Sequence, residues 1–341
     1  MSHWPFDPPI TPMEAKVRAT MPSGSHAYEP KWDGFRAVAW SDDIRLDSRN
    51  HRPLLRYFPE LEASLRSLPS GTVVDGEVVV VTDDHLDFDA LQLRLHPAES
   101  RVTLLADETP AQLVAFDLLA DAGDDLRSLP FAERRRRLEL LVPTLEGSWA
   151  LTPSTTDQEV ALRWFDEFEA AGCDGIVAKE IEGAYREGVR AMIKVKHRRS
   201  VDCVVGGYRV HKDGDKIGSI LLGLYTDDEQ LHFIGHCSGF SDHDRTEILH
   251  RLERLKTTDS FGDEVRRPGG ESRWSAGKDL SWVPVEPGVV VQVSYDQLTG
   301  GRFRHATRFE RWRPDKDAVS CTMDQLDRPE GPGFDAVVAT P

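Results

Sequence analysis

The sequence has few cysteines and no pattern in which they would bind a metal. Its 4 cysteines among 341 residues stand singly, with no Cys-x-x-Cys pair, so neither a zinc site nor a disulfide framework is predicted. No apolar run approaches the roughly 20 residues that cross a bilayer. The N-terminus lacks the basic start and apolar core of a secretion signal. We therefore expect a cytoplasmic protein that has no contact with a membrane.

The chain also lacks the common signatures of nucleotide-binding and hydrolytic enzymes. It has no complete phosphate loop, Gly-x-Gly-x-x-Gly, Gly-x-Ser-x-Gly or His-Glu-x-x-His, so a nucleotide would be bound by another route. Net positive charge is absent as well: the net charge is −16, which argues against a generic polyanion binder. The basic residues cluster at 134–137, 194–199 and 302–316. Such clusters indicate local anion sites, although the helical run 134–137 is expected to be a solvated face.

Apolar periodicity predicts two regions of different texture. Up to about residue 198, strands at 37–40, 72–81, 113–119, 175–179 and 192–196 alternate with helices at 59–68, 131–142 and 158–171. After residue 200 the predicted strands are 201–210, 217–225, 231–235, 289–295 and 307–312, with one helix that begins at Ser241. Five strands and a helix are what a small β-barrel of the oligonucleotide-binding (OB) type needs. Residues 327–341, rich in Pro, Gly and Asp, are predicted to be disordered.

One stretch concentrates charged side chains around a lysine. Residues 29–36 read Glu-Pro-Lys-Trp-Asp-Gly-Phe-Arg, so Lys31 stands between the carboxylates of Glu29 and Asp33. The apolar run 37–40 predicts a strand directly after it, and a junction of loop and strand is a common place for chemistry. A Lys-x-Asp-Gly match alone also fits an ordinary surface lysine, because short patterns arise by chance. The residues that accompany Lys31 must therefore decide.

Further short stretches place charged residues at or beside predicted strands in the same manner. They are residues 48–50, 74–78, 114–118, 174–179, 192–196 and 309–316. Strand alternation puts the side chains of Lys194 and Lys196 on one face. Taken singly, each stretch has an ordinary explanation, such as a surface position for Lys179 or a core position for Phe116. Their joint order, spacing and residue types match one known family.

The pattern resembles the covalent nucleotidyltransferases, and among them the ATP-dependent DNA ligases of the small two-domain bacterial ligase C type. The resemblance runs from about Pro8 to Leu326 and includes residues 88–94, 302–305 and 321–326. It implies an α+β fold, in which an adenylation (nucleotidyltransferase) domain of antiparallel sheets with flanking helices, residues 1–198, precedes an OB-fold domain, residues 199–326. It also implies ATP and Mg²⁺ (or Mn²⁺) as cofactors, nicked duplex DNA as substrate, other DNA repair proteins as further partners, and a monomer.

The resemblance assigns the catalytic role to Lys31, whose amine would attack the α-phosphate of ATP and carry AMP as a phosphoramidate. A free lysine is protonated at pH 7. The pKa of Lys31 is therefore expected to be lowered by burial and by neighbouring cations such as Lys179 and Lys196. By the same resemblance, positive charge at the α-phosphate would come from Lys179, Lys194 and Lys196.

The remaining assignments concern the rest of ATP, the metal and the nick. Glu77 and Asp174 would hold Mg²⁺, directly or through water, with the ribose as an alternative partner of Glu77. Phe116 would stack on adenine and Ile176 would cover its other face. The other nucleotide- and phosphate-binding residues that the resemblance implies are Glu29, Arg36, Arg49 and, for the pyrophosphate leaving group, Arg313, Asp315 and Lys316.

One departure from the family pattern and two alternatives stay open. Asp174 stands where the family more often has Glu, and one methylene less can move a metal ligand. The first alternative is an RNA ligase or a GTP-dependent capping enzyme, which share the Lys-x-Asp-Gly core; residues 302–316 favour a DNA ligase. The second is a catalytically silent nucleotide- or DNA-binding module, which the retained Lys31, Glu77 and Lys179 disfavour.

Overall fold

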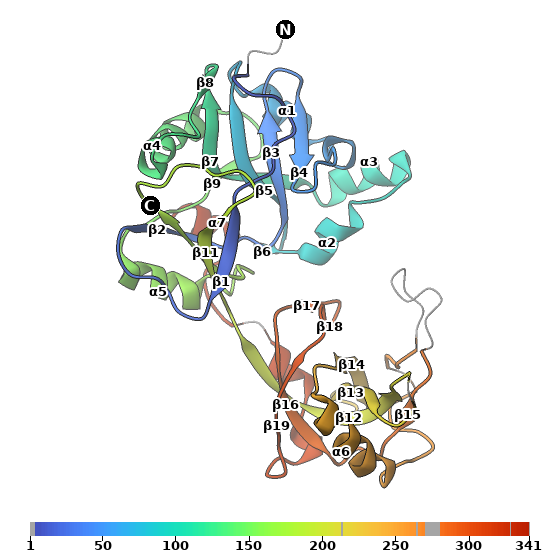
Figure 1. The fold of residues 1–341 in the computed structure, drawn as a ribbon. Coiled ribbons are helices and arrows are strands. Elements are labelled where there is room, and N and C mark those ends of the chain that lie inside the picture. Colours follow the sequence, from blue (N-terminus) through green and yellow to red (C-terminus); the bar gives the residue numbers. More distant parts are fainter. Residues whose placement is uncertain (1–3, 213, 264, 270–279, 328, 341) are drawn as a thin grey trace. The chain divides into compact units, whose positions relative to one another are not determined.

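The computed structural model forms two compact units, which are described separately (Figure 1). It describes every residue except 1–3, 213, 264, 270–279, 328 and 341. The first unit comprises Met1–His197 and Arg328–Pro341, and the second comprises Arg198–Asp327. The chain thus divides one residue from the predicted end of the adenylation domain.

Two sheets build the first unit. The 7-stranded sheet has the order β4-β3-β5-β7-β8, with β6 paired to β5 and β9 paired to β7, and the 4-stranded sheet has the order β1-β11-β10-β2. The strands of the larger sheet are β3 (Phe35–Trp40), β4 (Arg45–Ser48), β5 (Val73–Thr82), β6 (His85–Leu86), β7 (Ala111–Asp121), β8 (Asp124–Asp125) and β9 (Trp149–Leu151). Those of the smaller sheet are β1 (Glu14–Arg18), β2 (His26–Pro30), β10 (Gly175–Glu180) and β11 (Arg190–Lys196).

Helices flank these sheets and cover their apolar faces. They are α1 (Leu61–Arg66), α2 (Phe88–Leu93), α3 (Glu99–Glu108), α4 (Phe131–Leu141) and α5 (Gln158–Glu167). Asp157 caps α5 by accepting hydrogen bonds from the backbone N–H groups of Glu159 and Val160, which satisfies donors that a helix start leaves unpaired. A buried cluster with residues from both sheets, such as Val114 and Ile176, joins them into one core.

The prediction of a disordered C-terminal segment was wrong. Residues 327–341 were expected to be disordered, but Phe334–Val338 forms a short helix, α7, that belongs to the first unit. The side chain of Phe334 is 1% exposed and that of Val337 is fully buried. Apolar burial, which the polar composition of the segment conceals, therefore orders it.

The second unit has the topology of an OB-type barrel, as predicted. Its main strands are β12 (Arg199–Val210), β13 (Ile217–Tyr225), β14 (Leu231–Cys237), β16 (Val290–Tyr295) and β19 (Arg308–Trp312), in the order β14-β13-β12-β16-β19. The shorter strands are β15 (Val283–Pro284), β17 (Leu298–Thr299) and β18 (Arg302–Phe303). A parallel bridge between Cys237 and Thr307 links the end of β14 to the segment before β19, which closes the barrel. Helix α6 (Asp242–Glu253) begins at the Ser241 cap, as expected.

Candidate active site

Lys31 lies in the connection between β2 and β3, fixed against the start of β10. Its backbone N–H donates to the carbonyl of Gly175, and its own carbonyl accepts from the N–H of Asp174, both at 2.8 Å. The Lys31 amine lies 2.9 Å from Oδ2 of Asp174, and the amine of Lys196 lies 2.8 Å from the same oxygen. One buried carboxylate therefore holds two ammonium groups side by side.

Glycines let the backbones around Lys31 approach this closely. Gly175 has φ +129°, and a Cβ there would lie 2.0 Å from the carbonyl oxygen of Val195. A Cβ at Gly34 would lie 2.3 Å from the carbonyl oxygen of Val78. Contacts this short exclude any side chain, so these two glycines of the predicted motifs are required by the geometry.

The pKa of Lys31 is raised, whereas the sequence predicted that it would be lowered. Burial pushes the pKa of Lys31 down, but the carboxylates of Asp174, Asp33 and Glu77 outweigh it, so the pKa is raised. The excess of cations acts instead on Lys194, whose pKa is lowered by burial and by repulsion from Lys31 and other basic neighbours. The ion pair with Asp174 therefore favours the protonated form of Lys31.

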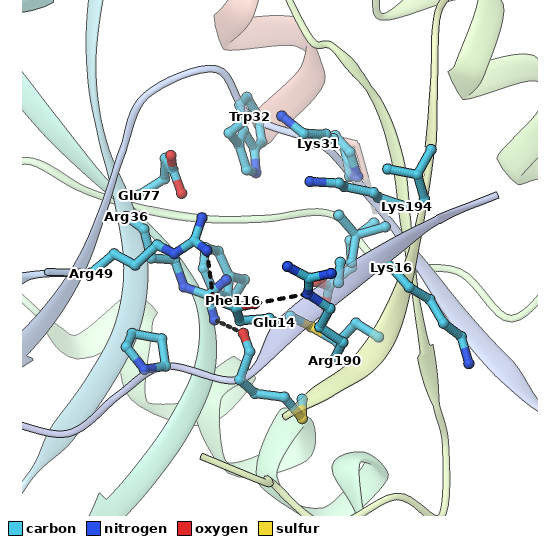
Figure 2. Close-up of a pocket in the computed structure, with 18 residues that line it drawn as sticks. Glu14, Lys16, Lys31, Trp32, Arg36, Arg49, Glu77, Phe116, Arg190 and Lys194 are labelled. Carbon is cyan, nitrogen blue, oxygen red and sulfur yellow. Dashed lines mark hydrogen bonds and ion pairs between the residues drawn. The ribbon is translucent and has the colours of Figure 1, made fainter. Parts of the chain in front are cut away.

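A pocket of about 650 Å³ opens beside Lys31 (Figure 2). Its lining includes the bases Lys16, Lys31, Arg36, Arg49, Arg190 and Lys194 and the acids Glu14, Glu29 and Glu77. Basic side chains thus outnumber carboxylates in a chain that is acidic overall. Such a lining favours a polyanionic ligand of the size of a nucleoside triphosphate.

Phe116 forms one end of the pocket, where a nucleobase is expected to lie. Its ring lines the pocket and is 9% exposed. The guanidinium of Arg36 lies 4.6 Å and the amine of Lys179 4.8 Å from the ring centroid. Two cations already lie against this ring, in positions typical of cation–π contacts. Phe116 thus lines the pocket, and its stacking on adenine stays a prediction.

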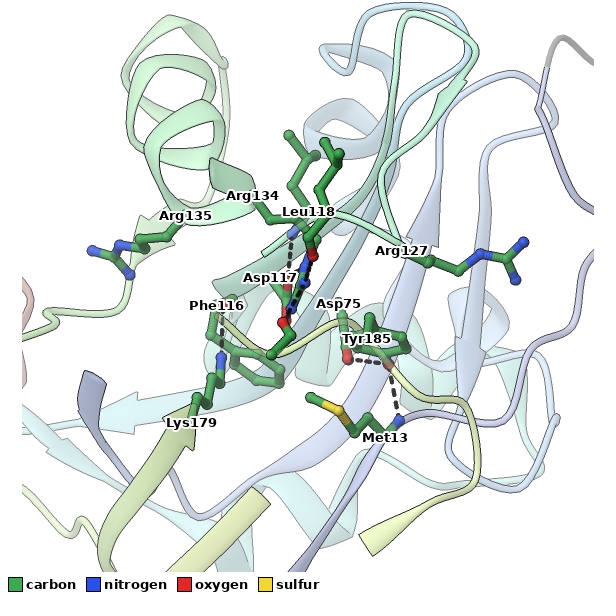
Figure 3. A network of polar contacts seen from close by, with 12 residues as sticks. Met13, Asp75, Phe116, Asp117, Leu118, Arg127, Arg134, Arg135, Lys179 and Tyr185 are labelled. Carbon is green, nitrogen blue, oxygen red and sulfur yellow. Dashed lines mark hydrogen bonds and ion pairs between the residues drawn. The ribbon is translucent and has the colours of Figure 1, made fainter. Parts of the chain in front are cut away.

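Lys179 lies toward the end of β10 that is far from Lys31. Its amine bonds Oε2 of Glu29 and the carbonyl of Phe116, both at 2.7 Å, and the side chain is only 4% exposed (Figure 3). In the register of β10 and β2, Lys179 pairs with Ala27, toward the opposite end of β10 from Gly175. The amine of Lys179 therefore lies at the Phe116 end of the pocket, and its contact with the α-phosphate stays a prediction.

Ile176 was also assigned wrongly, by one residue. Its side chain is fully buried in the core between the sheets, whereas the next residue, Val177, lines the pocket. Successive residues of a strand face opposite sides, so Val177 and Lys179 share the pocket side of β10. Val177, not Ile176, is the apolar residue of this strand that a nucleotide would touch.

Arg36 and Glu77 line the pocket on adjacent strands. Arg36 bonds both carboxylate oxygens of Asp75, at 2.6 and 2.5 Å, and Tyr185 donates to Asp75 at 2.6 Å (Figure 3). Burial lowers the pKa of Arg36, but the Asp75 carboxylate outweighs this and the guanidinium stays charged. Burial raises the pKa of Glu77 to about 7, against the opposing effect of Arg36 and Lys31.

Arg49 has a partner that the sequence did not reveal. Glu14 of β1 lies between two arginines, 2.5 Å from Nη2 of Arg49 and 3.2 Å from Nε of Arg190 (Figure 2). Hydrogen bonds from these arginines lower the pKa of Glu14. No pattern in the sequence indicated β1, which lies within the proline-rich residues 1–30.

The predicted residues of the second unit form a group of their own. Arg313 bonds Asp202 at 2.7 Å and Asp315 at 2.9 Å. Its hydrogen bonds lower the pKa of Asp315 to about 2. The N–H of Lys316 donates to the carbonyl of Arg313 at 3.2 Å. The proposed action of these residues on pyrophosphate stays a prediction.

Comparison with known proteins decides the family. The family model described as "ATP dependent DNA ligase domain" matches residues 11–196, and that described as "ATP dependent DNA ligase C terminal region" matches residues 213–316. The chain belongs to the ATP-dependent DNA ligases. The ligase is 50% identical to DNA ligase C2 of Mycolicibacterium smegmatis, covering 95% of this chain and 96% of that protein. It is 49% identical to DNA ligase C of Mycobacterium tuberculosis, again covering 95% and 96%.

A solved structure agrees on the fold. A structure from a study of the Lig E DNA ligases superposes with a TM-score of 0.56 at 17% identity, covering 88% of this chain and 98% of that one. At this identity the likeness concerns the fold alone. The expected α+β fold of an adenylation domain and an OB-like domain is therefore confirmed.

A Mg²⁺ ion would meet two carboxylates here, those of Asp174 and Glu77, rather than a closed cage. Among the described residues, no group of three or more His, Cys, Asp or Glu side chains is placed to hold a metal. Mg²⁺ needs only one or two carboxylates when substrate phosphates and water complete its shell, and Asp174 and Glu77 fit this requirement.

Across the part of the chain that the structure describes, no helix is long and apolar enough to pass through a bilayer.

Proposed function

We propose that this ligase joins the 5′-phosphate and 3′-hydroxyl ends of nicks in duplex DNA, in three steps that begin at Lys31. The observation that carries the proposal is the amine of Lys31 at the edge of a basic pocket, with Lys196 and Lys194 beside it. These cations can neutralise a phosphate that Lys31 attacks, and phosphoryl transfer depends chiefly on such positioning and charge neutralisation.

In the first step, Nζ of Lys31 loses a proton and attacks the α-phosphorus of ATP. A P–N bond forms, the bond from the α-phosphorus to the bridging oxygen breaks, and pyrophosphate leaves. Asp174 is shared between Lys31 and Lys196. When its carboxylate pairs with Lys196 alone, the pairing that raises the pKa of Lys31 is lost and the two neighbouring lysines lower it. Mg²⁺ bound near Asp174 and Glu77 would supply further positive charge to the phosphates.

In the second step, a 5′-phosphate oxygen of the nick attacks the α-phosphorus of the bound AMP. The P–N bond breaks and Lys31 regains its proton. In the third step, the 3′-hydroxyl loses its proton and attacks the 5′-phosphorus. The P–O bond to AMP breaks, AMP leaves, and the new P–O bond closes the strand. Arg49 at the pocket mouth is the residue we assign to the nick phosphate, because a guanidinium matches phosphate geometry. Arg313, Asp315 and Lys316 of the second unit would act on pyrophosphate in the first step.

The nucleotide base would lie against Phe116, with Val177 on the strand opposite and Glu29 and Lys179 at the base edge. This arrangement suits adenine, whose amino group can donate to a carboxylate or carbonyl oxygen. A role in DNA repair belongs to this proposal as well. A monomer, a cytoplasmic location and contacts with other repair proteins belong to the same proposal.

A panel of three substrates tests the proposal. The ligase is given ATP and Mg²⁺ with a nicked DNA duplex, the same duplex with ribonucleotides on the 3′ side of the nick, or single-stranded RNA. Closure of the DNA nick is expected. Joining of the RNA alone would establish an RNA ligase instead. In a separate reaction without nucleic acid, covalent labelling of the protein by GTP in place of ATP would establish a capping-type enzyme.

A further inference from the structure

Helix α7 at the C-terminal end of the chain is built into the first unit. Phe334 and Val337 belong to the same buried cluster as Trp32 and Ile176. The chain leaves the first unit after His197 and returns to it after Asp327. The unit that carries Lys31 is therefore completed by residues from both ends of the sequence.

The contacts of this segment show a specific seat. The N–H of Phe334 donates to the carbonyl of Asp84 at 2.6 Å, and the N–H of Asp335 donates to Oδ1 of Asp84 at 2.9 Å. A Cβ on Gly333 would lie 1.8 Å from Oδ2 of Asp84, and one on Gly331 would lie 2.7 Å from a side-chain atom of Ala170. Only glycines permit this fit, so the segment docks in one way.

Phe334 reaches from this seat to the residue next to the nucleophile. Its ring packs edge-on against the indole of Trp32, with centroids 5.6 Å apart at 63°. Trp32 also donates from Nε1 to Oγ1 of Thr152 at 2.9 Å and lines the pocket directly after Lys31. The indole is thus held by its hydrogen bond to Thr152, which directly follows β9, and by the ring of Phe334.

We infer that Phe334 is a positioning residue for the adenylation step, acting through Trp32 on the backbone that aims Lys31. The inference rests on the proposed role of Lys31. Phe334 lies in the core cluster and is not among the residues that line the pocket. Its effect must therefore pass through Trp32. Displacement of a reacting group by a fraction of an ångström is costly to the rate of the step that uses it.

The matched pair Phe334→Ala and Val337→Ala tests this inference. Both variants remove buried apolar atoms from α7, and Phe334 is the one whose aromatic ring packs edge-on against the Trp32 indole. Three quantities are measured in full-length protein: the single-turnover rate of enzyme–AMP formation at saturating ATP, the rate of closing a nick that already carries AMP, and the thermal midpoint. The second rate does not require attack by Lys31.

For Phe334→Ala we expect the adenylation rate to fall about tenfold, while closing of the pre-adenylated nick stays within about twofold of wild type. Val337→Ala should lower the thermal midpoint but leave both rates within about twofold. Phe334→Leu, which keeps most of the buried volume and loses the ring, should show the selective loss even if the alanine variant fails to fold.

Two results would overturn the inference. One is an unchanged adenylation rate in Phe334→Leu and in folded Phe334→Ala. The other is an equal loss of both rates in the Phe334 and Val337 variants, which would mean that α7 serves stability alone. Absence of label at Lys31 in the wild-type protein would instead contradict the proposed function, so the two failures are distinguishable.

Discussion

Asp174 is the residue on which the position and the pKa of the Lys31 amine depend. One of its carboxylate oxygens lies within 2.9 Å of the amines of both Lys31 and Lys196. A shorter side chain than the family's usual Glu keeps this carboxylate close to the β10 backbone. The pairing orients Lys31 but also favours its protonated, unreactive form. Asp174 therefore couples the position of the nucleophile to its protonation state.

Replacement of Asp174 by Asn should shift the pH dependence of adenylation. The attacking amine must be neutral, and below its pKa the neutral fraction of Lys31 rises about tenfold with each pH unit. Asp174 raises the pKa of Lys31, so its removal should move the rising limb of the log rate to lower pH. The limb's position is the readout, because the maximum rate should also fall. Single-turnover labelling with ATP across pH 6 to about 10 measures it.

Asp107→Asn, on the exposed surface of α3, is the matched control and should leave the profile in place. A rising limb of Asp174→Asn at the wild-type pH, or at higher pH, would contradict the assigned coupling.

Three of the predicted residues have positions that follow from a local pattern in the sequence. Lys31, Glu77 and Phe116 each lie at a loop or strand whose apolar flanks are explicit in the sequence, and all three line the pocket. Strand alternation, applied to β10, would also have given Val177 in place of Ile176. The place of Lys179 needed the register of β10 against β2, which depends on contacts between distant residues.

At the scale of elements, the start of β10 joins the nucleophile loop to the β11 lysines. Gly175 adopts a positive φ there, and its Cα faces the Val195 carbonyl so closely that no Cβ fits. Asp174 directly precedes this point. The geometry of the carboxylate that holds Lys31 therefore depends on a glycine that takes no part in the chemistry.

Gly175→Ala should abolish adenylation by displacing Asp174 and the start of β10. A loss of about 100-fold or more is expected, because misplacement of about 1 Å in a reacting group can have this effect. The rate of enzyme–AMP formation measures it. Gly214→Ala, at another glycine of positive φ but with open space around its Cβ position, is the control. An active, stable Gly175→Ala ligase would show that the close approach of β10 to β11 is not required.

Helix α4 changed the interpretation of the basic run 134–137. We expected a solvated face, but Arg134 is fully buried and bonds Asp117 through two nitrogens, at 2.7 and 3.0 Å (Figure 3). Arg136 is the exposed member and pairs with Glu133. Consecutive residues of a helix point in different directions, so a run of like residues need not share one environment.

Arg134→Ala should destabilise the first unit strongly, since it leaves the Asp117 carboxylate buried and unpaired. The expected loss in the free energy of unfolding is about 3–5 kcal/mol, measured by denaturant titration. Arg136→Ala breaks only an exposed pair and should leave the free energy of unfolding nearly unchanged. Equal losses in the two variants would show that the Arg134 pair carries no special weight.

The tail shows where composition fails as a predictor of order. The sequence of residues 327–341 is polar on average, but two apolar side chains, Phe334 and Val337, are buried and dock helix α7. Their seat is made by Asp84, Trp32 and α5, which are far away in the sequence. Order that depends on such distant partners leaves no local pattern to find.

At the scale of the whole molecule, a strongly acidic chain must bind a polyanion. The net charge of −16 repels DNA except where basic residues gather, as at the pocket mouth around Arg49 and Arg190. Binding that relies on such phosphate contacts weakens steeply with salt. The adenylation step involves no DNA and lies in a partly enclosed pocket.

Salt should therefore separate the two activities. Between about 50 and 200 mM salt, the KM for nicked DNA should rise by roughly tenfold or more, whereas enzyme–AMP formation from ATP changes far less. Steady-state sealing and single-turnover adenylation, measured in the same buffers, make the comparison. A parallel fall of both activities would mean that salt acts on the fold or on the nucleotide and not on the grip of DNA.

The central claim is that Lys31 carries AMP. The most direct measurement is to incubate the ligase with Mg²⁺ and ATP labelled at the α-phosphate, isolate the protein, and locate the label by mass spectrometry of its peptides. Lys256→Ala, a surface lysine of the second unit paired with Glu253, serves as the control. One acid-labile AMP is expected on Lys31 in the wild-type and control proteins, and none in Lys31→Ala. Label that persists in Lys31→Ala, or that maps to another residue, would contradict it.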